Sequence, residues 1–297
     1  MNLFITRTRF GMSASLAALL LVFSGVAATE GPFWKVSGAN GTAYLFGSVH
    51  FGTDEIYPLD AAVENAFARA DRLAVEVNLQ AVNGHALGLW MAQHGAIADG
   101  ATLSDTVSPE TWRLLQRRAE ELGVPAGAFA FQRPWLAAFS MTALALVREG
   151  FREELGIDRH FLTRATGEKP IRELETIETQ MGLLAGLPPE VEAHFLHMTL
   201  EDLGSRDGVF PGLFQAWKRG DAEAIRAQSE DMRAGPHGQA LFSRLIEQRN
   251  ENMAEGIARI LEEEGGTTFV VVGAAHLVGP DGVASLLASR GYRVEKR

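Results

Sequence analysis

Short apolar runs bounded by turn residues lie near both ends of the chain, and a different pattern occupies its middle. Runs rich in β-branched and aromatic side chains predict strands. The first two runs are separated by Ala39-Asn40-Gly41, which is typical of a hairpin turn. The run at residues 269–273 has no polar residue, which predicts a strand buried on both faces of a sheet. The predicted strands are Phe33–Ser37, Thr42–Phe46, Leu73–Val77, Lys169–Leu174, Phe269–Gly273 and Tyr292–Glu295.

Between residues 80 and 265 the apolar side chains recur mainly at the helical spacing of about 3.6 residues. Another helix is predicted over Leu59–Ala70, where Asp60 is a favourable N-terminal cap. Strands near both termini that enclose a long helical insertion predict an α/β fold, with a central, mostly parallel β-sheet built from the N- and C-terminal parts. Because no repeat or flexible linker divides residues 29–297, we predict one domain. The predicted helices of the middle region are Thr111–Glu121, Pro134–Arg148, Asp158–Ala165, Ile177–Ala185, Glu190–Leu203, Leu213–Lys218 and Gln239–Glu264.

The N-terminus has the composition of a secretion signal. Arg7 and Arg9 form a basic region, and Met12–Ala28 is almost entirely apolar or small and ends in Val-Ala-Ala, which suits a signal peptidase. An uncleaved membrane anchor is the alternative, but the apolar core Leu16–Phe23 is shorter than the ~20 residues that span a bilayer. We therefore predict that residues 1–28 are a cleaved signal peptide and that the protein is periplasmic or secreted, without stable membrane insertion.

The charge of the chain and its lack of cysteine limit both partners and metal chemistry. The formal net charge of −10 becomes −12 without residues 1–28, which hold two arginines and no acidic residue. An acidic protein with no run of Lys and Arg is a poor partner for nucleic acid or anionic lipid. Without cysteine, any metal site must be built from His, Asp and Glu side chains.

Two segments of one pattern stand at opposite ends of the predicted domain. In each, an apolar strand ends in Gly-x-x-His, from Gly47 to His50 and from Gly273 to His276, and another glycine follows. Glycine at a strand end permits a sharp turn or the close approach of a neighbour. Each histidine then lies just past the carboxyl end of its strand, where open α/β sheets bind ligands. The alternative is that these are turn glycines with two incidental imidazoles.

Glu76 lies inside the otherwise apolar run Leu73–Val77. A buried carboxylate is unfavourable unless it is paired, hydrogen-bonded or bound to a metal, although a strand with one exposed face would let Glu76 point to solvent. Two imidazoles and a carboxylate at adjacent strand ends are suitable ligands for a divalent ion. We therefore predict a metal site of His50, Glu76 and His276, which would acidify a bound water.

Four more side chains are candidates for the same site. Arg249 and Asn250 interrupt apolar stripes of the last predicted helix, so both need polar partners. A catalytic carboxylate or a substrate carbonyl would serve Arg249, and so would a purely structural ion pair. Arg133 directly precedes a predicted helix and Glu175 directly follows a predicted strand; either is equally compatible with a cap or a surface residue.

Other motifs carry less weight. His194 and His197 share a face of a predicted helix, but their spacing is not that of the HExxH zinc motif and no glutamate lies between them. Packing or surface roles are therefore favoured for this pair. The sequence has no GxSxG, GxxxxGK[ST] or GxGxxG motif, so serine-hydrolase and nucleotide-dependent chemistry lack support.

The order of these features resembles the TraB/GumN family, which includes the Tiki metalloproteases. The matching segments are YLFGSVHFG, LAVEV, GIDRHFLTRATGEKPIRELETIETQ, the pair Arg249-Asn250 and VVVGAAHLVGPDGV, and together they extend over most of residues 29–297. The resemblance implies a fold related to erythromycin esterase-like and haem-binding ChaN-like proteins. In the Tiki branch it implies manganese- or cobalt-dependent peptide cleavage. The metal or catalytic positions and their supports that it implies are His50, Glu76, His276, Arg133, Glu175, Arg249 and Asn250.

The sequence thus predicts an exported metal-dependent hydrolase that cleaves a peptide or amide bond of a peptide or small-molecule substrate. The divalent metal ion would be Mn²⁺, Co²⁺ or Zn²⁺. Glu76 or Glu175 would serve as general base, and Arg249 or Arg133 would stabilise the oxyanion. Ester hydrolysis stays open, as does the oligomeric state. The alternative from another class is a non-catalytic periplasmic protein that binds a peptide, a metal or haem.

Overall fold

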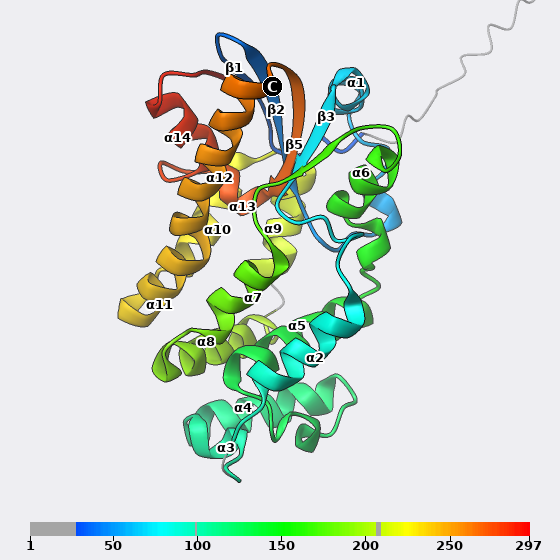
Figure 1. Ribbon diagram of the computed structural model, residues 1–297. Helices are drawn as coiled ribbons and strands as arrows, with labels where there is room; N and C mark the ends of the chain where they lie inside the picture. Colours follow the sequence, from blue (N-terminus) through cyan, green and yellow to red (C-terminus); the bar gives the residue numbers. More distant parts are fainter. Residues whose placement is uncertain (1–27, 99, 206–208) are drawn as a thin grey trace, which may run out of the picture.

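The computed structural model describes residues 28–98, 100–205 and 209–297, and its six strands form one sheet in the order β4-β3-β5-β2-β1-β6 (Figure 1). Four neighbouring strands, β4, β3, β5 and β2, run parallel, and β1 is antiparallel to both β2 and β6. The predicted mostly parallel α/β sheet is confirmed. The strand bounds are β1 (Phe33–Ser37), β2 (Gly41–Ser48), β3 (Arg72–Val75), β4 (Ile171–Glu173), β5 (Gly266–Gly273) and β6 (Arg293–Lys296).

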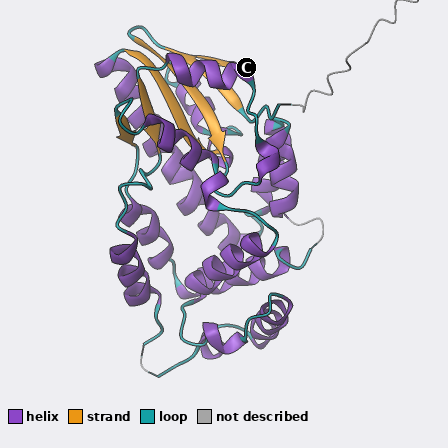
Figure 2. Ribbon diagram, turned by 90° about the vertical axis from the view of Figure 1, so that its right-hand side faces the viewer, coloured by secondary structure: helices purple, strands orange, loops and turns teal. Residues whose placement is uncertain are grey.

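Helices cover both faces of the sheet and also form a body beyond one end of it. Figure 1 shows α1 (Ala61–Arg69) and α6 (Ile157–Ala165) on one side, and α12 (Gln248–Arg259) and α14 (Val283–Ser289) on the other. In Figure 2 the strands gather at one end of the molecule and helices fill the rest. The remaining α-helices are α2 (Gly84–Gly95), α3 (Leu103–Thr106), α4 (Pro109–Glu121), α5 (Pro134–Arg148), α7 (Ile177–Ala185), α8 (Pro189–Asp202), α9 (Val209–Lys218), α10 (Ala222–Asp231), α11 (Gly235–Phe242) and α13 (Ala274–Leu277).

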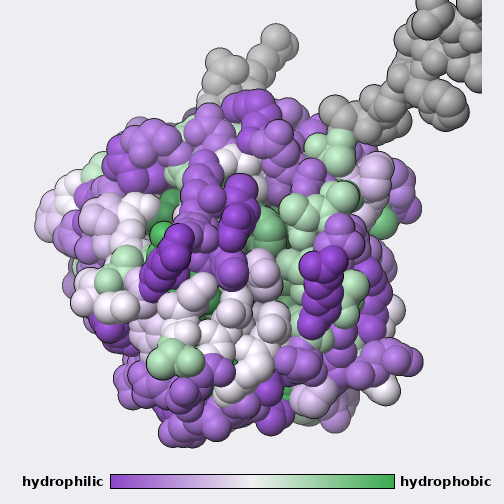
Figure 3. All heavy atoms as spheres, turned by 90° about the horizontal axis from the view of Figure 1, so that it is seen from above, coloured by the Kyte–Doolittle hydropathy of each residue, from purple (hydrophilic) through white to green (hydrophobic). Residues whose placement is uncertain are grey.

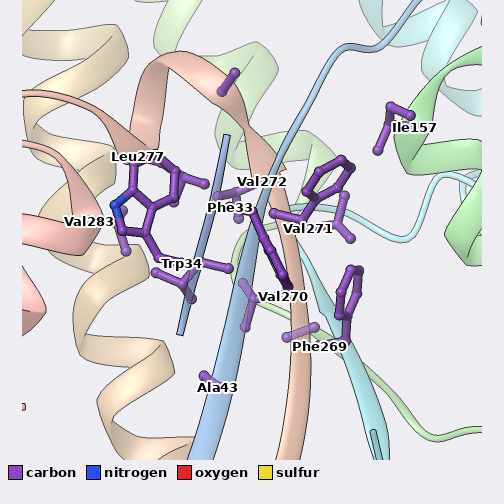
Figure 4. Packing of buried hydrophobic residues seen from close by; sticks show 14 of the residues in the cluster. Phe33, Trp34, Ala43, Ile157, Phe269, Val270, Val271, Val272, Leu277 and Val283 are labelled. Atoms are coloured by element: carbon purple, nitrogen blue, oxygen red, sulfur yellow. The ribbon is translucent and has the colours of Figure 1, made fainter. Parts of the chain in front are cut away.

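Strand β5 is the centre of the main core. Its residues 268–272 are all buried, and successive side chains alternate between the two faces of the sheet (Figure 4). The ring of Phe269 packs against Phe46, Phe67 and Phe161, with ring centroids 6.3, 5.5 and 4.8 Å away. These rings come from β2, α1 and α6, so one aromatic cluster fixes two strands against the helices that cover them.

A second apolar cluster holds the helical body together. It joins α3, α4, α5 and α8, and its fully buried members include Leu103, Leu115, Met141, Leu196 and Leu200. The chain enters this body after β3 and returns to the sheet at β4, so the predicted helical insertion is present and the short edge strand β4 interrupts it.

Local signals predicted most elements, and the exceptions have physical reasons. Asp60 caps α1 as predicted, accepting a hydrogen bond from the N–H of Ala62 (2.7 Å). The predicted helix at 239–264 begins earlier, at residue 235, and contains two π-helical segments, Ser243–Glu247 and Ile260–Glu264. Helices α2, α10 and α14 were not predicted, and neither were the four-residue helices α3 and α13. Helix α2 contains internal glycines and apolar residues all around, α10 is mainly polar, and α14 is short, so none shows a clear 3.6-residue period.

The structure describes almost none of the predicted signal peptide, but it does allow the described helices to be checked for a membrane span. The predicted signal peptide falls on residues 1–28, of which 1–27 lie outside the described residues. Across the ranges that are described, no helix combines the length and the apolar character needed to cross a membrane. The face seen from above in Figure 3 is mainly hydrophilic, with hydrophobic residues in separate areas between the hydrophilic ones.

Candidate active site

Four parallel strands end at one edge of the sheet, on the side of the helical body. Ser48, the last residue of β2, is paired with Gly273, the last of β5, and Val75 at the end of β3 is paired with Val271. The side chains that follow these strands are therefore neighbours. The candidates that follow β2, β3, β4 and β5 are, in that order, His50, Glu76, Glu175 and His276.

The two strand-end glycines leave room for their neighbours. A Cβ on Gly273 would lie 3.2 Å from both Glu76 Oε1 and His276 Cδ2, and the Gly273 N–H donates a hydrogen bond to Glu76 Oε1 (2.6 Å). A Cβ on Gly47 would lie 2.5 Å from the ring of Pro32. Close approach therefore excludes a side chain at Gly47 unless Pro32 shifts and makes one tight at Gly273, while neither glycine has a positive φ.

Glu76 and Glu175 lie side by side, and Arg249 binds both. The Glu175 N–H donates to the Glu76 carbonyl (2.9 Å), which extends the β3–β4 ladder past the strand ends. Arg249 Nη2 donates to Glu76 Oε2 (2.6 Å) and to Glu175 Oε2 (2.8 Å), and its Nε donates to Glu175 Oε1 (3.0 Å). Gln180 Nε2 also donates to both carboxylates (3.0 and 2.9 Å). Since the Glu76, Glu175 and Arg249 side chains are only 6%, 4% and 14% exposed, this is a buried ion cluster.

Burial and charge act in opposite directions on the pKa of Glu76. Burial alone would raise it, but the charges of His276, Arg249 and His50 and the N–H of Gly273 lower the pKa to about 2. Burial lowers the pKa of His276 to about 4, so its imidazole is neutral at neutral pH. The permanent charge of Arg249 is then the main reason why Glu76 stays ionised there.

The ring of His276 is held by Asn250, a buried residue of α12. His276 Nδ1 lies 2.7 Å from Asn250 Oδ1, and Asn250 Nδ2 donates to the carbonyl of Asp281 (2.8 Å). Because the amide nitrogen is committed to a carbonyl, Oδ1 accepts the proton of Nδ1, which leaves Nε2 of His276 with its lone pair. Nε2 lies 4.0 Å from Glu76 Oε1.

The ring of His50 is held by Asp158, which is not among the predicted site residues. His50 Nδ1 lies 2.9 Å from Asp158 Oδ2, while Ser48 Oγ donates to Asp158 Oδ1 (2.9 Å). The charge of Asp158 raises the pKa of His50 to about 9, against an opposing effect of desolvation and with a further contribution from their hydrogen bond. A signal was available, because Asp158 shares a helical face with the buried Phe161 and Leu162. The His50 side chain is 58% exposed, so water screens this pair and limits its effect on stability.

The residues fit a divalent ion in their donor chemistry. Each imidazole has Nδ1 held by a side-chain oxygen and Nε2 turned away from that partner, which is how metal-binding histidines are usually supported. Their spacing does not form a ready site: within the ranges that the structure describes, no group of three or more His, Asp or Glu side chains is placed to hold an ion.

Two other sets of candidates lie in the helical body. Arg133 Nη1 donates to the carbonyl of His94 (3.0 Å), its backbone N–H donates to the carbonyl of Gly95 (2.7 Å), and its Nη2 pairs with the buried carboxylate of Glu192. The structure therefore places Arg133 at the end of α2 and not in the cluster of Arg249. His197, on α8, lies 3.0 Å from Thr111 Oγ1 through its Nδ1.

Comparison with known proteins gives a match along nearly the whole chain. The model of the TraB/PrgY/gumN family matches residues 32–296. An uncharacterized protein YbaP of Shigella flexneri is 26% identical over 249 residues, which cover 84% of this chain and 88% of the relative. YbaP of Escherichia coli (strain K12) is 26% identical over 245 residues, 82% of this chain and 87% of the relative. An uncharacterized protein of Treponema pallidum (strain Nichols) is 21% identical over 272 residues, 88% of this chain and 81% of the relative. No solved structure matches the chain significantly.

The buried ion cluster yields a prediction about stability. Arg249→Met leaves two adjacent buried carboxylates without their permanent counter-charge, so we expect the free energy of unfolding at neutral pH to fall by about 3–5 kcal/mol. Lowering the pH by about two units should restore part of this loss, because protonating a carboxylate relieves the repulsion. Denaturant titration measures both effects. The control, Arg290→Met, removes a partly exposed pair with Glu251 and should lower the free energy of unfolding by less than about 1 kcal/mol. If the free energy of unfolding falls equally in the two variants, the buried ion cluster contributes no more to stability than an exposed pair.

The pair of His50 and Asp158 yields a prediction about pH. In Asp158→Asn we expect the pKa of His50 to fall from about 9 toward its usual 6.5, as measured by NMR titration of the imidazole ring. Since the pKa is raised in the folded state, the pair stabilises the protein fully below pH 6.5, and this contribution is lost as the pH rises through 9. The control Asp54→Asn, which removes an exposed pair with Arg152, should leave the titration of His50 unchanged. An unchanged pKa of His50 in Asp158→Asn would show that Asp158 is not the cause of the raised value.

Proposed function

The chain belongs to the TraB/PrgY/gumN family, and from that premise we propose that it is an exported metal-dependent hydrolase that cleaves a peptide or amide bond. One observation carries the proposal: two imidazoles of fixed orientation and two buried carboxylates follow four neighbouring parallel strands. This edge is the usual ligand-binding position in open α/β sheets. The resemblance to the Tiki branch supports a peptide bond and a divalent ion.

In this proposal His50, Glu76 and His276 hold a Mn²⁺, Co²⁺ or Zn²⁺ ion. Such an ion lowers the pKa of a coordinated water and polarises a carbonyl. His276 is ready to act as a ligand at neutral pH, because its imidazole is neutral there and Asn250 holds its Nδ1. His50 has a pKa of about 9, so it must release a proton on binding, and the affinity for metal should increase with pH.

The two carboxylates differ in what they can do for a substrate. Glu76 is a weak base, because its pKa is lowered to about 2, and this favours a role as ligand over a role as general base. Glu175 lines an open cleft of about 490 Å³, and it would act as general base if a bound molecule replaced Gln180 as a partner of its carboxylate. Arg249 already uses Nε, Nη1 and Nη2 in hydrogen bonds to protein oxygens, so its role is to position the carboxylates and not to stabilise an oxyanion.

A non-catalytic binding or accessory role is the second candidate, and one observation favours it. The carboxylates of Glu76 and Glu175 are both engaged by Arg249, and the described side chains do not form a ready three-ligand metal site. Such a protein would bind a peptide, a metal or haem and be stabilised by it without forming a product.

Turnover separates the two candidates. We expect the purified protein to cleave members of a quenched-peptide library only when Mn²⁺, Co²⁺ or Zn²⁺ is added. His276→Ala and Glu175→Gln should lower kcat/KM by about 100-fold or more, because each removes a group that acts on the reacting water or bond. The control His197→Ala, in the helical body, should keep its activity. Full activity in His276→Ala would contradict the proposal, and ligand-induced stabilisation without any product would favour the binding role.

A further inference from the structure

A groove of about 460 Å³ lies beside the carboxylates, between α2 and α7. This volume is within the range of about 300–1,000 Å³ that is usual for small-molecule sites. Most of its lining is apolar and comes from both helices and from the segment after β3. The larger apolar side chains that line it are Val77, Val82, Leu87, Trp90, Ile177 and Met181.

The groove begins one residue beyond each of the two carboxylates. Val77, which follows Glu76, and Thr176, which follows Glu175, are both part of its lining. Thr176 and Glu173 also line the 490 Å³ cleft that contains Glu175, so the groove and the cleft meet at the end of β4. A molecule that presents a bond to Glu175 can therefore place an adjoining group in the groove.

Helix α2 forms the outer wall of the groove, and packing in a core does not explain its apolar side chains. Within α2, all of which is described, Gly95 alone is buried, although the sequence GHALGLWMAQHG is mostly apolar. The wall is nevertheless anchored. Arg133 binds the carbonyls of His94 and Gly95 at the C-terminal end of α2. The ring of Trp90 stacks on that of His94 with 4.0 Å between centroids.

The polar groups of the groove select against an anionic occupant. Glu173 and Glu178 are acidic residues of the lining, and Asn78 and Asn83 are the amides. Its lining contains no Lys, Arg or His side chain to bind a carboxylate or a phosphate. An acyl chain with an anionic head group is thus disfavoured, whereas an apolar side chain on an uncharged peptide backbone suits both the lining and the amides.

From these observations we propose that the groove between α2 and α7 binds a bulky apolar side chain of a peptide substrate, next to the bond that is cleaved. This inference rests on the proposed hydrolase function, because it assigns the groove to the same substrate. Helix α2 then determines specificity, and Arg133 is a positioning residue that fixes the end of this wall.

Binding can be tested without turnover by calorimetric titration of the purified metal-free protein. The probe is acetyl-Ala-Leu-Phe-Leu-Ala-amide, with acetyl-Ala-Ser-Asn-Ser-Ala-amide as the polar counterpart and dodecanoate as the anionic acyl chain. We expect saturable binding of the apolar peptide, a Kd at least about tenfold higher for the polar peptide, and no comparable binding of dodecanoate. Tighter binding of dodecanoate than of the apolar peptide would overturn the proposal.

Two variants on the same helix locate the binding. Ala86→Trp places a large ring in the groove, which Ala86 lines, and should raise the Kd of the apolar peptide at least about tenfold. The matched control is Leu89→Ser, which changes a 60% exposed residue of α2 outside the groove lining and should leave the Kd within about twofold. Thermal unfolding of both variants checks that each remains folded. Equal Kd values for wild type and a folded Ala86→Trp would overturn the proposal.

Cleavage distinguishes a failure of the groove from a failure of the hydrolase. With quenched peptides that differ in one residue, wild type should prefer Leu or Phe over Gly by at least about tenfold in kcat/KM, and Ala86→Trp should lose this preference. If peptides bind as predicted but are never cleaved with any of the three metals, the proposed peptide-binding groove is supported and the proposed hydrolase function is contradicted. If they are cleaved and neither Kd nor kcat/KM responds to Ala86→Trp, the groove proposal alone falls.

Discussion

The pairing of Arg249 with Glu76 and Glu175 is the interaction on which the arrangement of the strand ends depends. Two carboxylates that follow adjacent parallel strands are buried within hydrogen-bonding distance of the same guanidinium. Without a counter-charge, such a pair would be costly to bury in ionised form. Arg249 therefore ties α12 to the ends of β3 and β4, and the next residue, Asn250, ties the same helix to His276 after β5. The π-helical segment Ser243–Glu247 ends two residues before Arg249. Such segments are frequent next to functional residues.

The two strand-end histidines are supported in the same way. The two Gly-x-x-His segments follow neighbouring strands, and a helix supplies an oxygen to Nδ1 of each histidine: Asp158 from α6 and Asn250 from α12. The two oxygens differ in charge, which is one reason why the pKa values of the histidines diverge, to about 9 for His50 and about 4 for His276. Burial of His276 is the larger cause of its shift. One edge of the sheet thus holds a cationic, exposed imidazole and a neutral, buried one beside an ionised carboxylate.

The sequence predicted the fold better than it predicted the surroundings of the candidate residues. Local patterns of a few residues predict strands such as β1 and β5, and both lie close to their predicted bounds. The cap of α1 is also predicted by such a pattern. The partners of Arg249 are 173 and 74 residues away in sequence, so no local pattern could decide between a substrate carbonyl and an internal acid. Arg133 belongs to the anchor of α2, a helix whose even distribution of apolar residues hid it from the periodicity argument. Asp158 could have been found, because a carboxylate on the buried face of a helix needs a partner for the same reason that Glu76 does.

The central claim is that Nε2 of both strand-end histidines is available to one divalent ion. Pulsed electron paramagnetic resonance of Mn²⁺ added to the purified protein reports this directly, because a coordinated imidazole gives a nitrogen coupling that water and carboxylate do not. Our account predicts a bound Mn²⁺ coupled to two imidazole nitrogens in wild type, and to one in His50→Ala or in His276→Ala. Absence of bound Mn²⁺, or bound Mn²⁺ whose nitrogen couplings are the same in wild type and both variants, would contradict it.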